Sequence, residues 1–296
     1  MATLKDVKTK IGAVKKTKQI TKAMNMVAAS KLRGAQTKME GFRPYASKFS
    51  EVLGSLAEKA GDDASPLLQP RENVKKINIV LCTSDRGLCG GFNASLIARA
   101  QKLYKEKREQ NIEVSFTCFG KKGRDWCKKN QIPIESEHLG IVGANFGFTI
   151  AANVGRMLIN GFNEELYDEV YMVYAEFVSM AKQTSMVKQL LPIPPLTPEE
   201  TEQEEEQNFL AEHICEPSPA GVLGELLPRD VSVQIYSSLL ETSTSEHSAR
   251  MTAMNNATKA CDDMIENLTL AYNKARQAAI TGELMDIVGG VEALKG

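Results

Sequence analysis

The chain has 296 residues, with 36 basic and 37 acidic side chains, and 43% of its residues are hydrophobic. A net charge of -1 argues against a uniformly basic nucleic-acid-binding protein, and the apolar content argues against an intrinsically disordered chain. The first residues lack the apolar core of a signal peptide, and no segment approaches the ~20 apolar residues of a membrane span. Six irregularly spaced cysteines without a C-x-x-C motif indicate reduced thiols. These features predict a cytoplasmic protein whose membrane association is peripheral, with no direct membrane insertion.

The first 59 residues have helical periodicity and contain a single proline, Pro44. Their apolar residues recur at steps of three and four, which places them on one face of a helix. The middle of this face is rich in small residues, so a second helix can approach it closely. The predicted seam consists of Ile20, Met24, Ala28, Leu32, Ala35, Met39 and Phe42.

The C-terminal part of the chain has the same pattern. It predicts a helix of ~60 residues from about Asp230 to the end, with a break at Pro228. The predicted seam consists of Met254, Ala257, Cys261, Met264, Leu268, Ala271, Ala275 and Ala278. Each terminal helix has an apolar face to bury and a mate only at the other end of the chain. We therefore expect the two to pair as an antiparallel coiled coil.

Between the two helices, short apolar strands alternate with helices. This alternation is typical of an α/β domain with a mainly parallel sheet. The predicted strands are 75–83, 112–119, 132–136, 169–177 and 185–191, and the predicted helices are 93–110, 121–130 and 143–162.

The fold class is therefore α/β: an antiparallel coiled coil of the N- and C-terminal helices plus a central Rossmann-like α/β domain. The predicted domains are an N-terminal shaft helix (1–59), an α/β foot domain (74–216) and a C-terminal shaft helix (217–296). Within the second domain, residues 199–206 contain six glutamates in eight positions. Such a run of like charge is typical of a solvated loop.

The segment most similar to an enzyme site is a glycine-rich turn, Thr83–Asn93, between a strand and a helix. Phosphates bind at such turns, but the sequence matches neither G-x-G-x-x-G nor the P-loop pattern. A tight turn for close packing is the favoured interpretation. Cys89 within it is interpreted as a packed thiol, because no histidine that could serve as its base is near it in the sequence. The sequence thus predicts no catalytic residues, no cofactor and no metal ion.

The basic residues of the first helix are unusual. Ten lysines and arginines face a single acid, Asp6, over residues 1–38. A solvated face, a DNA-binding basic helix and a surface for an acidic protein partner are all compatible with this pattern. Against DNA binding, the charges overlap the apolar seam and aromatic residues for stacking are absent.

Three segments together resemble the gamma subunit of F-type ATP synthases, of the bacterial type. They are Gln19–Leu32 (QITKAMNMVAASKL), Asp85–Asn93 (DRGLCGGFN) and the stretch from Glu246–Met254 (EHSARMTAM) through Tyr272–Leu284 (YNKARQAAITGEL). The similarity spans the whole chain, and the segments occur in the order and at the separations of that family.

The resemblance implies a central-stalk rotor, one copy per complex, that transmits rotation of the c-ring, driven by the proton gradient, to the catalytic beta subunits for ATP synthesis. The subunit itself would be non-catalytic and bind no cofactor. Its implied partners are the alpha and beta subunits, the epsilon subunit and the c-ring, at the cytoplasmic face of the bacterial inner membrane. No nucleic acid is among them.

The resemblance also implies individual contact residues. Met24 corresponds to a shaft residue near an acidic lever of the beta subunit, and Arg250 to an arginine involved in coupling. Implied contacts with the beta catch loop are Arg276, Gln277, Thr281 and Glu283. The last apolar turns, with Met285, Ile287, Val288, Val291 and Leu294, would sit in an apolar bearing at the top of the ring.

Glu216 corresponds to a contact of the foot with epsilon and the c-ring, although Cys215 stands where the family often has an aromatic residue. Chloroplast members of the family carry a regulatory dithiol. Because no two cysteines are close in this sequence, we predict no thiol switch. Two alternatives stay open. The first is a dinucleotide-type enzyme, which the missing glycine fingerprint disfavours. The second is a basic coiled coil that binds nucleic acid, which a steep salt dependence of binding would support.

Overall fold

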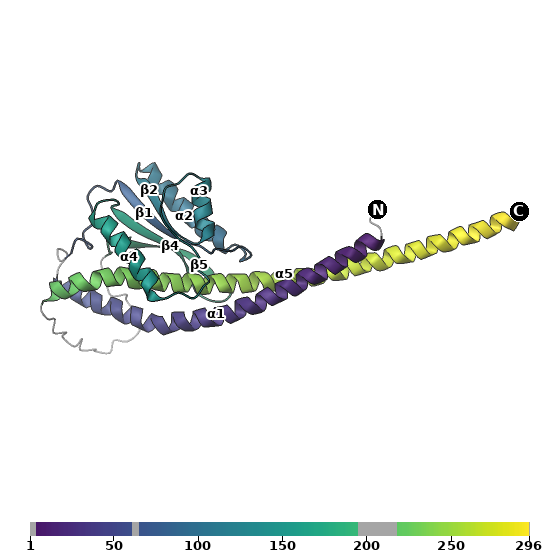
Figure 1. The fold of residues 1–296 in the computed structure, drawn as a ribbon, viewed down its shortest axis with the longest axis horizontal. Helices are drawn as coiled ribbons and strands as arrows, with labels where there is room; N and C mark the ends of the chain where they lie inside the picture. The colour runs from purple at the N-terminus through teal and green to yellow at the C-terminus, as the bar shows by residue number, and fades with distance from the viewer. Residues whose placement is uncertain (1–3, 61–64, 195–217, 296) are drawn as a thin grey trace. The chain divides into compact units, whose positions relative to one another are not determined.

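The computed structural model describes residues 4–60, 65–194 and 218–295. Along the sequence, one long helix precedes the strands of a five-stranded sheet and a second long helix follows them (Figure 1). The helices are α1 (Leu4–Ala60), α2 (Phe92–Glu109), α3 (Lys121–Lys129), α4 (Phe148–Asn163) and α5 (Pro219–Lys295). The strands are β1 (Lys76–Cys82), β2 (Glu113–Phe119), β3 (Ile134–His138), β4 (Glu169–Phe177) and β5 (Gln183–Leu191).

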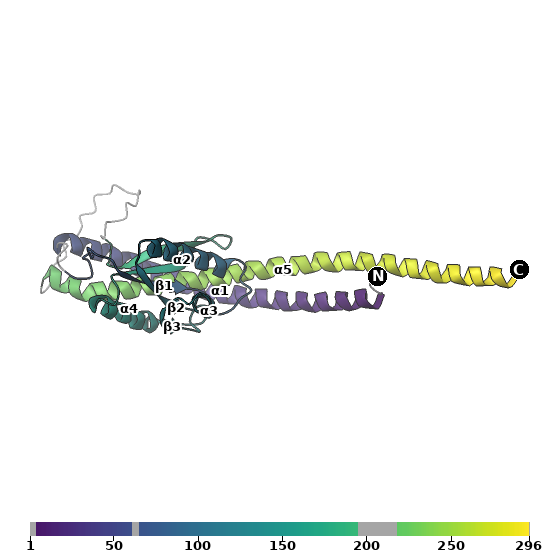
Figure 2. The same cartoon turned by 90° about the horizontal axis from the view of Figure 1, so that it is seen from above.

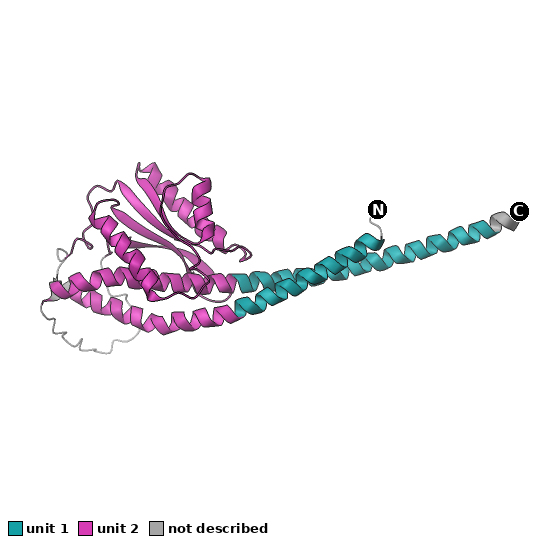
Figure 3. Cartoon of the chain, viewed as in Figure 1, with its two compact units in different colours: residues 1–29, 250–296 teal, residues 30–249 magenta. Residues whose placement is uncertain are grey.

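The chain forms two compact units (Figure 3). Unit 1 comprises residues 1–29 and 250–296, and unit 2 comprises residues 30–249. Unit 1 consists of the first part of α1 and the last part of α5. Unit 2 contains the sheet, its covering helices and the remaining parts of α1 and α5.

The sheet of unit 2 has the strand order β3-β2-β1-β4-β5. The four strands from β3 to β4 are parallel, and β5 pairs with β4 in the antiparallel direction. In the central strand β1 every residue from Ile77 to Cys82 is buried, as expected for a strand covered on both faces. A mainly parallel sheet was predicted, and the structure confirms it.

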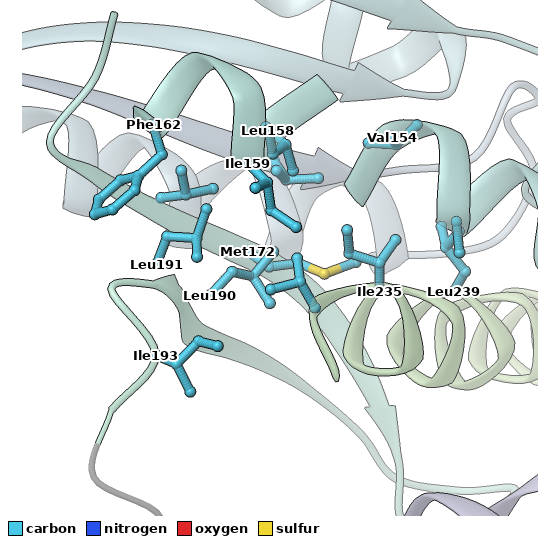
Figure 4. Packing of buried hydrophobic residues seen from close by; sticks show 14 of the residues in the cluster. Val154, Leu158, Ile159, Phe162, Met172, Leu190, Leu191, Ile193, Ile235 and Leu239 are labelled. Atoms are coloured by element: carbon cyan, nitrogen blue, oxygen red, sulfur yellow. The ribbon is translucent and has the colours of Figure 1, made fainter. Parts of the chain in front are cut away.

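Alternate residues of the strands build two hydrophobic cores. Ile77, Ile79 and Leu81 of β1 contribute to the core under α2 and α3. Val80 and Cys82 contribute to the opposite core, which is shared with α4, α5 and part of α1. Figure 4 shows this second core, where Ile235 and Leu239 of α5 meet side chains of α4, β4 and β5. Full burial of such side chains stabilises the fold by about 1.5–3 kcal/mol each.

Three details of the helices differ from the prediction. α5 has 77 residues and continues through Pro228 without a break. The residue four positions earlier is Gly224, whose missing side chain leaves the backbone free to adjust to the proline ring. α4 begins at Phe148 and not at residue 143, because Gly140 and Gly143 have φ values of 75° and 83°, which a helix cannot contain.

The seams also differ in part. Ile20 is 60% exposed, and the buried residue at this level is Thr21. On α5, Met264, Ala271 and Ala278 are exposed, whereas Ile265, Tyr272 and Ala279 are half-buried. Alternate positions of the predicted seam were thus off by one residue, whereas Cys261, Leu268 and Ala275 are half-buried as predicted. Burial of Ile265 and Tyr272 removes more apolar area from water.

Candidate functional site

Polar contacts join the two helices of unit 1 in the part of the chain that the structure describes. The side chain of Lys18 forms an ion pair with Asp262. The Thr258 hydroxyl donates to the Thr21 hydroxyl over 2.9 Å, and the Asn25 amide donates to the Met251 carbonyl oxygen over 2.8 Å. Residue numbers fall on α5 as they rise on α1, so the pair is antiparallel, as predicted. Polar groups within a helix pair fix its register, because a shift would leave them unsatisfied.

The register leaves the end of α5 without a facing helix. At 1.5 Å per residue in both helices, Leu4 lies level with about residue 275. About 20 further residues of α5, roughly 30 Å of helix, therefore extend past the described start of α1. Both views of the chain show this extension (Figures 1 and 2).

The extension carries large apolar side chains in contact with solvent. Every residue from 281 to 291 is exposed. The large apolar residues among them are Leu284, Met285, Ile287, Val288 and Val291, with exposed fractions between 48% and 69%. A contiguous apolar surface of this kind marks a site of interaction with another molecule. The described part of the chain has no helix long and apolar enough to cross a membrane.

The sequence-predicted contact residues lie mainly on this unit. Met24 and Arg250 are half-buried. Arg276, Gln277, Thr281 and Glu283 are exposed on α5. Arg276 and Glu283, seven residues apart, share one side of the helix, and so do Gln277 and Thr281, four apart. Glu216 lies outside the described residues.

Basic side chains surround the first part of α1. Lys18, which pairs with Asp262, is half-buried. Exposed basic residues of this helix in unit 1 are Lys5, Lys8, Lys10, Lys15, Lys16 and Lys22. Ile20, Met26 and Val27 are also exposed, at 58–60%, so apolar and basic groups alternate on the solvent side of α1. This mixture suits a protein surface with acidic side chains better than a purely solvated face.

In unit 2, the glycine-rich turn is closed by its own polar groups. The Asn93 amide donates to the Ser84 hydroxyl over 2.8 Å, and the Ser84 backbone N–H donates to the Asn93 side-chain oxygen over 3.0 Å. The Asp85 carboxylate accepts the backbone N–H groups of Lys121 (3.1 Å) and Gly140 (3.0 Å). A carboxylate of the chain thus occupies the start of α3, where an anion would otherwise bind. The turn joins neighbouring loops through these polar groups, but an added Cβ at Gly87 or Gly91 would meet no atom within 4 Å, so these two glycines do not serve the close packing that was predicted.

The cysteines of unit 2 are packed in the cores. Cys89 is 2% exposed, which agrees with its interpretation as a packed thiol. Cys118 and Cys127, nine residues apart in the sequence, bring their sulfur atoms within 3.7 Å in the fold, a proximity that their sequence spacing does not show. β2 and α3 bring the pair together. Their mutual contact, together with burial, raises the pKa of Cys127 and disfavours the reactive thiolate.

His138 ends β3, and its ring stacks on Phe119 with centroids 4.9 Å apart. Burial lowers the pKa of His138. As the pH falls below ~6.5, His138 is therefore protonated in the unfolded chain before it is protonated in the folded chain. The free energy of unfolding decreases as a result. We expect the urea midpoint, followed by the fluorescence of Trp126, to fall less between about pH 7.5 and 5.5 in His138→Phe than in wild type. Equal falls in both proteins would contradict this assignment.

Sequence reasoning missed the polar register of unit 1. Thr21, Asn25 and Thr258 are not apolar, so a search for hydrophobic periodicity passes over them. The spacing of four residues between Thr21 and Asn25 on α1 was the available signal. Among the described residues, no group of three or more His, Cys, Asp or Glu side chains is arranged to hold a metal ion.

Comparison with known proteins gives one consistent result. A family model described as ATP synthase matches residues 3–294. The ATP synthase gamma chain of Desulfosudis oleivorans is 64% identical over 298 aligned positions, covering 100% of both chains. The gamma chain of Nitratidesulfovibrio vulgaris, strain Hildenborough, is 55% identical, also over 100% of both chains.

Solved structures show the same fold at low identity. A chain of the Euglena gracilis mitochondrial ATP synthase rotor has a TM-score of 0.65 at 21% identity, covering 94% of this chain and 98% of that one. A chain of the Tetrahymena thermophila mitochondrial ATP synthase central stalk and c-ring has a TM-score of 0.59 at 24% identity, covering 80% and 99%.

Proposed function

Because the chain belongs to the ATP synthase gamma chain family, we propose that it is the central-stalk rotor subunit of a proton-translocating F-type ATP synthase. In this role it transmits rotation of the c-ring to the catalytic beta subunits and performs no chemistry itself. The alpha, beta and epsilon subunits and the c-ring are its partners, with one copy of the chain per complex. The complex is placed at the cytoplasmic face of the bacterial inner membrane, with this subunit bound peripherally.

The observation that carries the proposal is the unpaired end of α5. Its exposed apolar residues from Leu284 to Val291 need a surrounding apolar surface, which a ring of alpha and beta subunits would supply. A pair of helices has no threefold symmetry, so it presents a different side to each of three beta subunits. Rotation of the pair would then change their contacts in turn, and with them their affinities for nucleotides.

The individual contacts are proposed on the same basis. Arg276, Gln277, Thr281 and Glu283 are exposed on α5, where they are accessible to a loop of the beta subunit. Met24 and Arg250 would contact the beta subunit farther from the C-terminal end of α5, where α1 and α5 are paired. The basic side chains of α1 would face acidic loops of beta, because opposite potentials attract at such a surface. In the sequence, the α/β domain, residues 74–216, lies between the shaft helices 1–59 and 217–296. This domain, with Glu216, would contact epsilon and the c-ring.

Reconstitution tests this function. Alpha and beta subunits assembled with the chain, epsilon and the membrane sector should couple ATP hydrolysis to proton pumping, whereas the assembly without the chain should not. A truncation after Thr281 is the matched variant, because it removes the exposed apolar turns and leaves every residue that faces α1. It should bind the ring more weakly. Equal coupling with and without the chain would exclude a rotor.

We also predict that dithiothreitol leaves the ATPase rate of the complex unchanged. Cys118 and Cys127 are buried, and the raised pKa of Cys127 keeps it protonated and unreactive toward disulfide exchange. The rate is to be compared before and after reduction, with wild type and with a Cys118→Ala variant. A rate that depends on reduction in wild type but not in the variant would contradict the prediction.

A further inference from the structure

The loop between β3 and α4, residues 139–147, lies across both long helices within unit 2, and we refer to it as the strap. Its path is set by Gly140 and Gly143, whose φ values of 75° and 83° belong to the left-handed region. The Ala144 N–H donates to the Ile141 carbonyl over 3.0 Å and closes a turn between them. The strap is thus a shaped loop with a defined conformation.

Two lysines of α1 bind the strap. The Lys31 amino group donates to the Gly143 carbonyl oxygen over 3.3 Å. The Lys38 amino group donates to the Asn145 side-chain oxygen. The lysines are seven residues apart and share one side of α1, so both reach the same loop. Both acceptors are uncharged, so these are charge-assisted hydrogen bonds and not ion pairs.

The strap also packs on α5. A side chain at Gly143 would approach the Glu246 carboxylate to 3.4 Å, so the loop backbone lies directly against this residue. Phe146 is 9% exposed, and its ring meets Tyr236 of α5 edge-on at 5.8 Å. The same Tyr236 ring meets Phe42 of α1 at 4.8 Å. One aromatic side chain therefore joins the strap to both helices through edge-on ring contacts, which aromatic pairs favour.

The start of the strap is fixed to the α/β layer. The Gly140 N–H donates to Asp85, whose other carboxylate oxygen accepts the Lys121 N–H at the start of α3. A continuous set of contacts thus leads from β1 and α3 through the strap to α1 and α5. α5 is anchored further by its own buried residues, from Leu223 to Leu240. α1 has fewer such anchors, since between Leu32 and Leu53 only Met39 is buried.

We infer that the strap is a clamp that fastens α1 to the α/β domain, and that Lys31 and Lys38 are positioning residues for the transmission of rotation. The inference rests on the proposed rotor function. A rotor transmits torque only if its helices and the domain that receives the rotation turn together. The clamp supplies this for α1 at the level of residues 31–38.

The test uses the complete ATP synthase complex carrying Lys31→Met and Lys38→Met together. Met keeps much of the apolar stem and removes the donor. Amide hydrogen exchange in residues 139–147 should become about tenfold faster, because the variant lacks the two hydrogen bonds by which Lys31 and Lys38 hold the loop closed. Proton pumping at an equal rate of ATP hydrolysis should fall about twofold. The Lys31→Arg, Lys38→Arg complex keeps both donors and should regain both wild-type values.

Two further variants separate the clamp from charge. Lys48→Met removes a cation of α1 that pairs with Glu51, and it should change neither readout. Gly143→Ala changes no charge, strains the left-handed backbone against Glu246 and should accelerate exchange as the double variant does.

Unchanged exchange in the double Met variant would overturn the clamp, and so would faster exchange with unchanged pumping. Failure of the rotor function itself would appear separately, as loss of any effect of the chain on coupling in the wild-type complex.

Discussion

A complex that carries Met24→Lys should pump protons roughly threefold less at an equal rate of ATP hydrolysis, while its subunits still assemble. Met24 is half-buried beside Asn25, the residue that fixes the register of the helix pair. A lysine there can extend its amino group to solvent and add a cation on the surface proposed to meet an acidic lever of beta. The stronger attraction between the helix pair and the beta subunit would keep the rotor in one rotational position for longer than in the wild-type complex.

Met26→Lys is the matched control. Met26 lies two residues along the same helix and is 60% exposed, so the substitution adds the same charge without disturbing the pair. Two residues along a helix turn the side chain by about 200°, which directs it away from the contact proposed for Met24. We expect a much smaller loss of pumping in this variant. Equal losses would show that added charge anywhere on α1 suffices, and unchanged pumping in Met24→Lys would exclude the proposed contact.

Gly120→Ala should destabilise the α/β domain by about 3 kcal/mol or more. Gly120 precedes α3 with φ 89° and ψ 150°, a conformation that residues with a side chain rarely adopt. Its added Cβ would lie 2.1 Å from the Thr83 carbonyl oxygen, a backbone atom that cannot move aside without shifting the end of β1. The urea midpoint, followed by the fluorescence of Trp126, measures the effect, because this single tryptophan lies on α3.

Gly91→Ala provides the comparison. Gly91 precedes α2 with φ -81°, and an added Cβ meets no atom within 4 Å. This substitution should change the free energy of unfolding by less than about 1 kcal/mol. An equal loss of unfolding free energy in both alanine variants would contradict this explanation. It would mean that the chain entropy of glycine, and not the close approach at Gly120, determines the stability of this edge of the sheet.

Much of the fold could be predicted because it follows from periodicity. The strand 169–177 was predicted with the bounds that the structure has, since its residues form a compact β-branched and aromatic run. The long helices were predicted from apolar steps of three and four. The start of α4 and the strap could not be predicted, because their apolar residues continue the helical pattern while two glycines with positive φ break the helix.

The contact residues are a different case. Apolar residues such as Met285 look like core positions in the sequence, and only the missing partner helix shows that they are exposed. Lys31 and Lys38 look like solvated lysines, because their acceptors lie more than 100 positions away in the chain. The energetics of Met24 and Arg276 depend on subunits other than this one. Their roles came from resemblance and remain proposals.

The most direct test of the rotor is to observe rotation. Lys102 on α2 is exposed and is not among the residues proposed to contact the beta subunit, so Lys102→Cys can carry a biotin and a bead once Cys215 and Cys261 are replaced by serine. With the alpha and beta subunits fixed to a surface, ATP should drive the bead in one direction with three pauses per turn. A bead that stays still while the same complexes hydrolyse ATP would contradict the account.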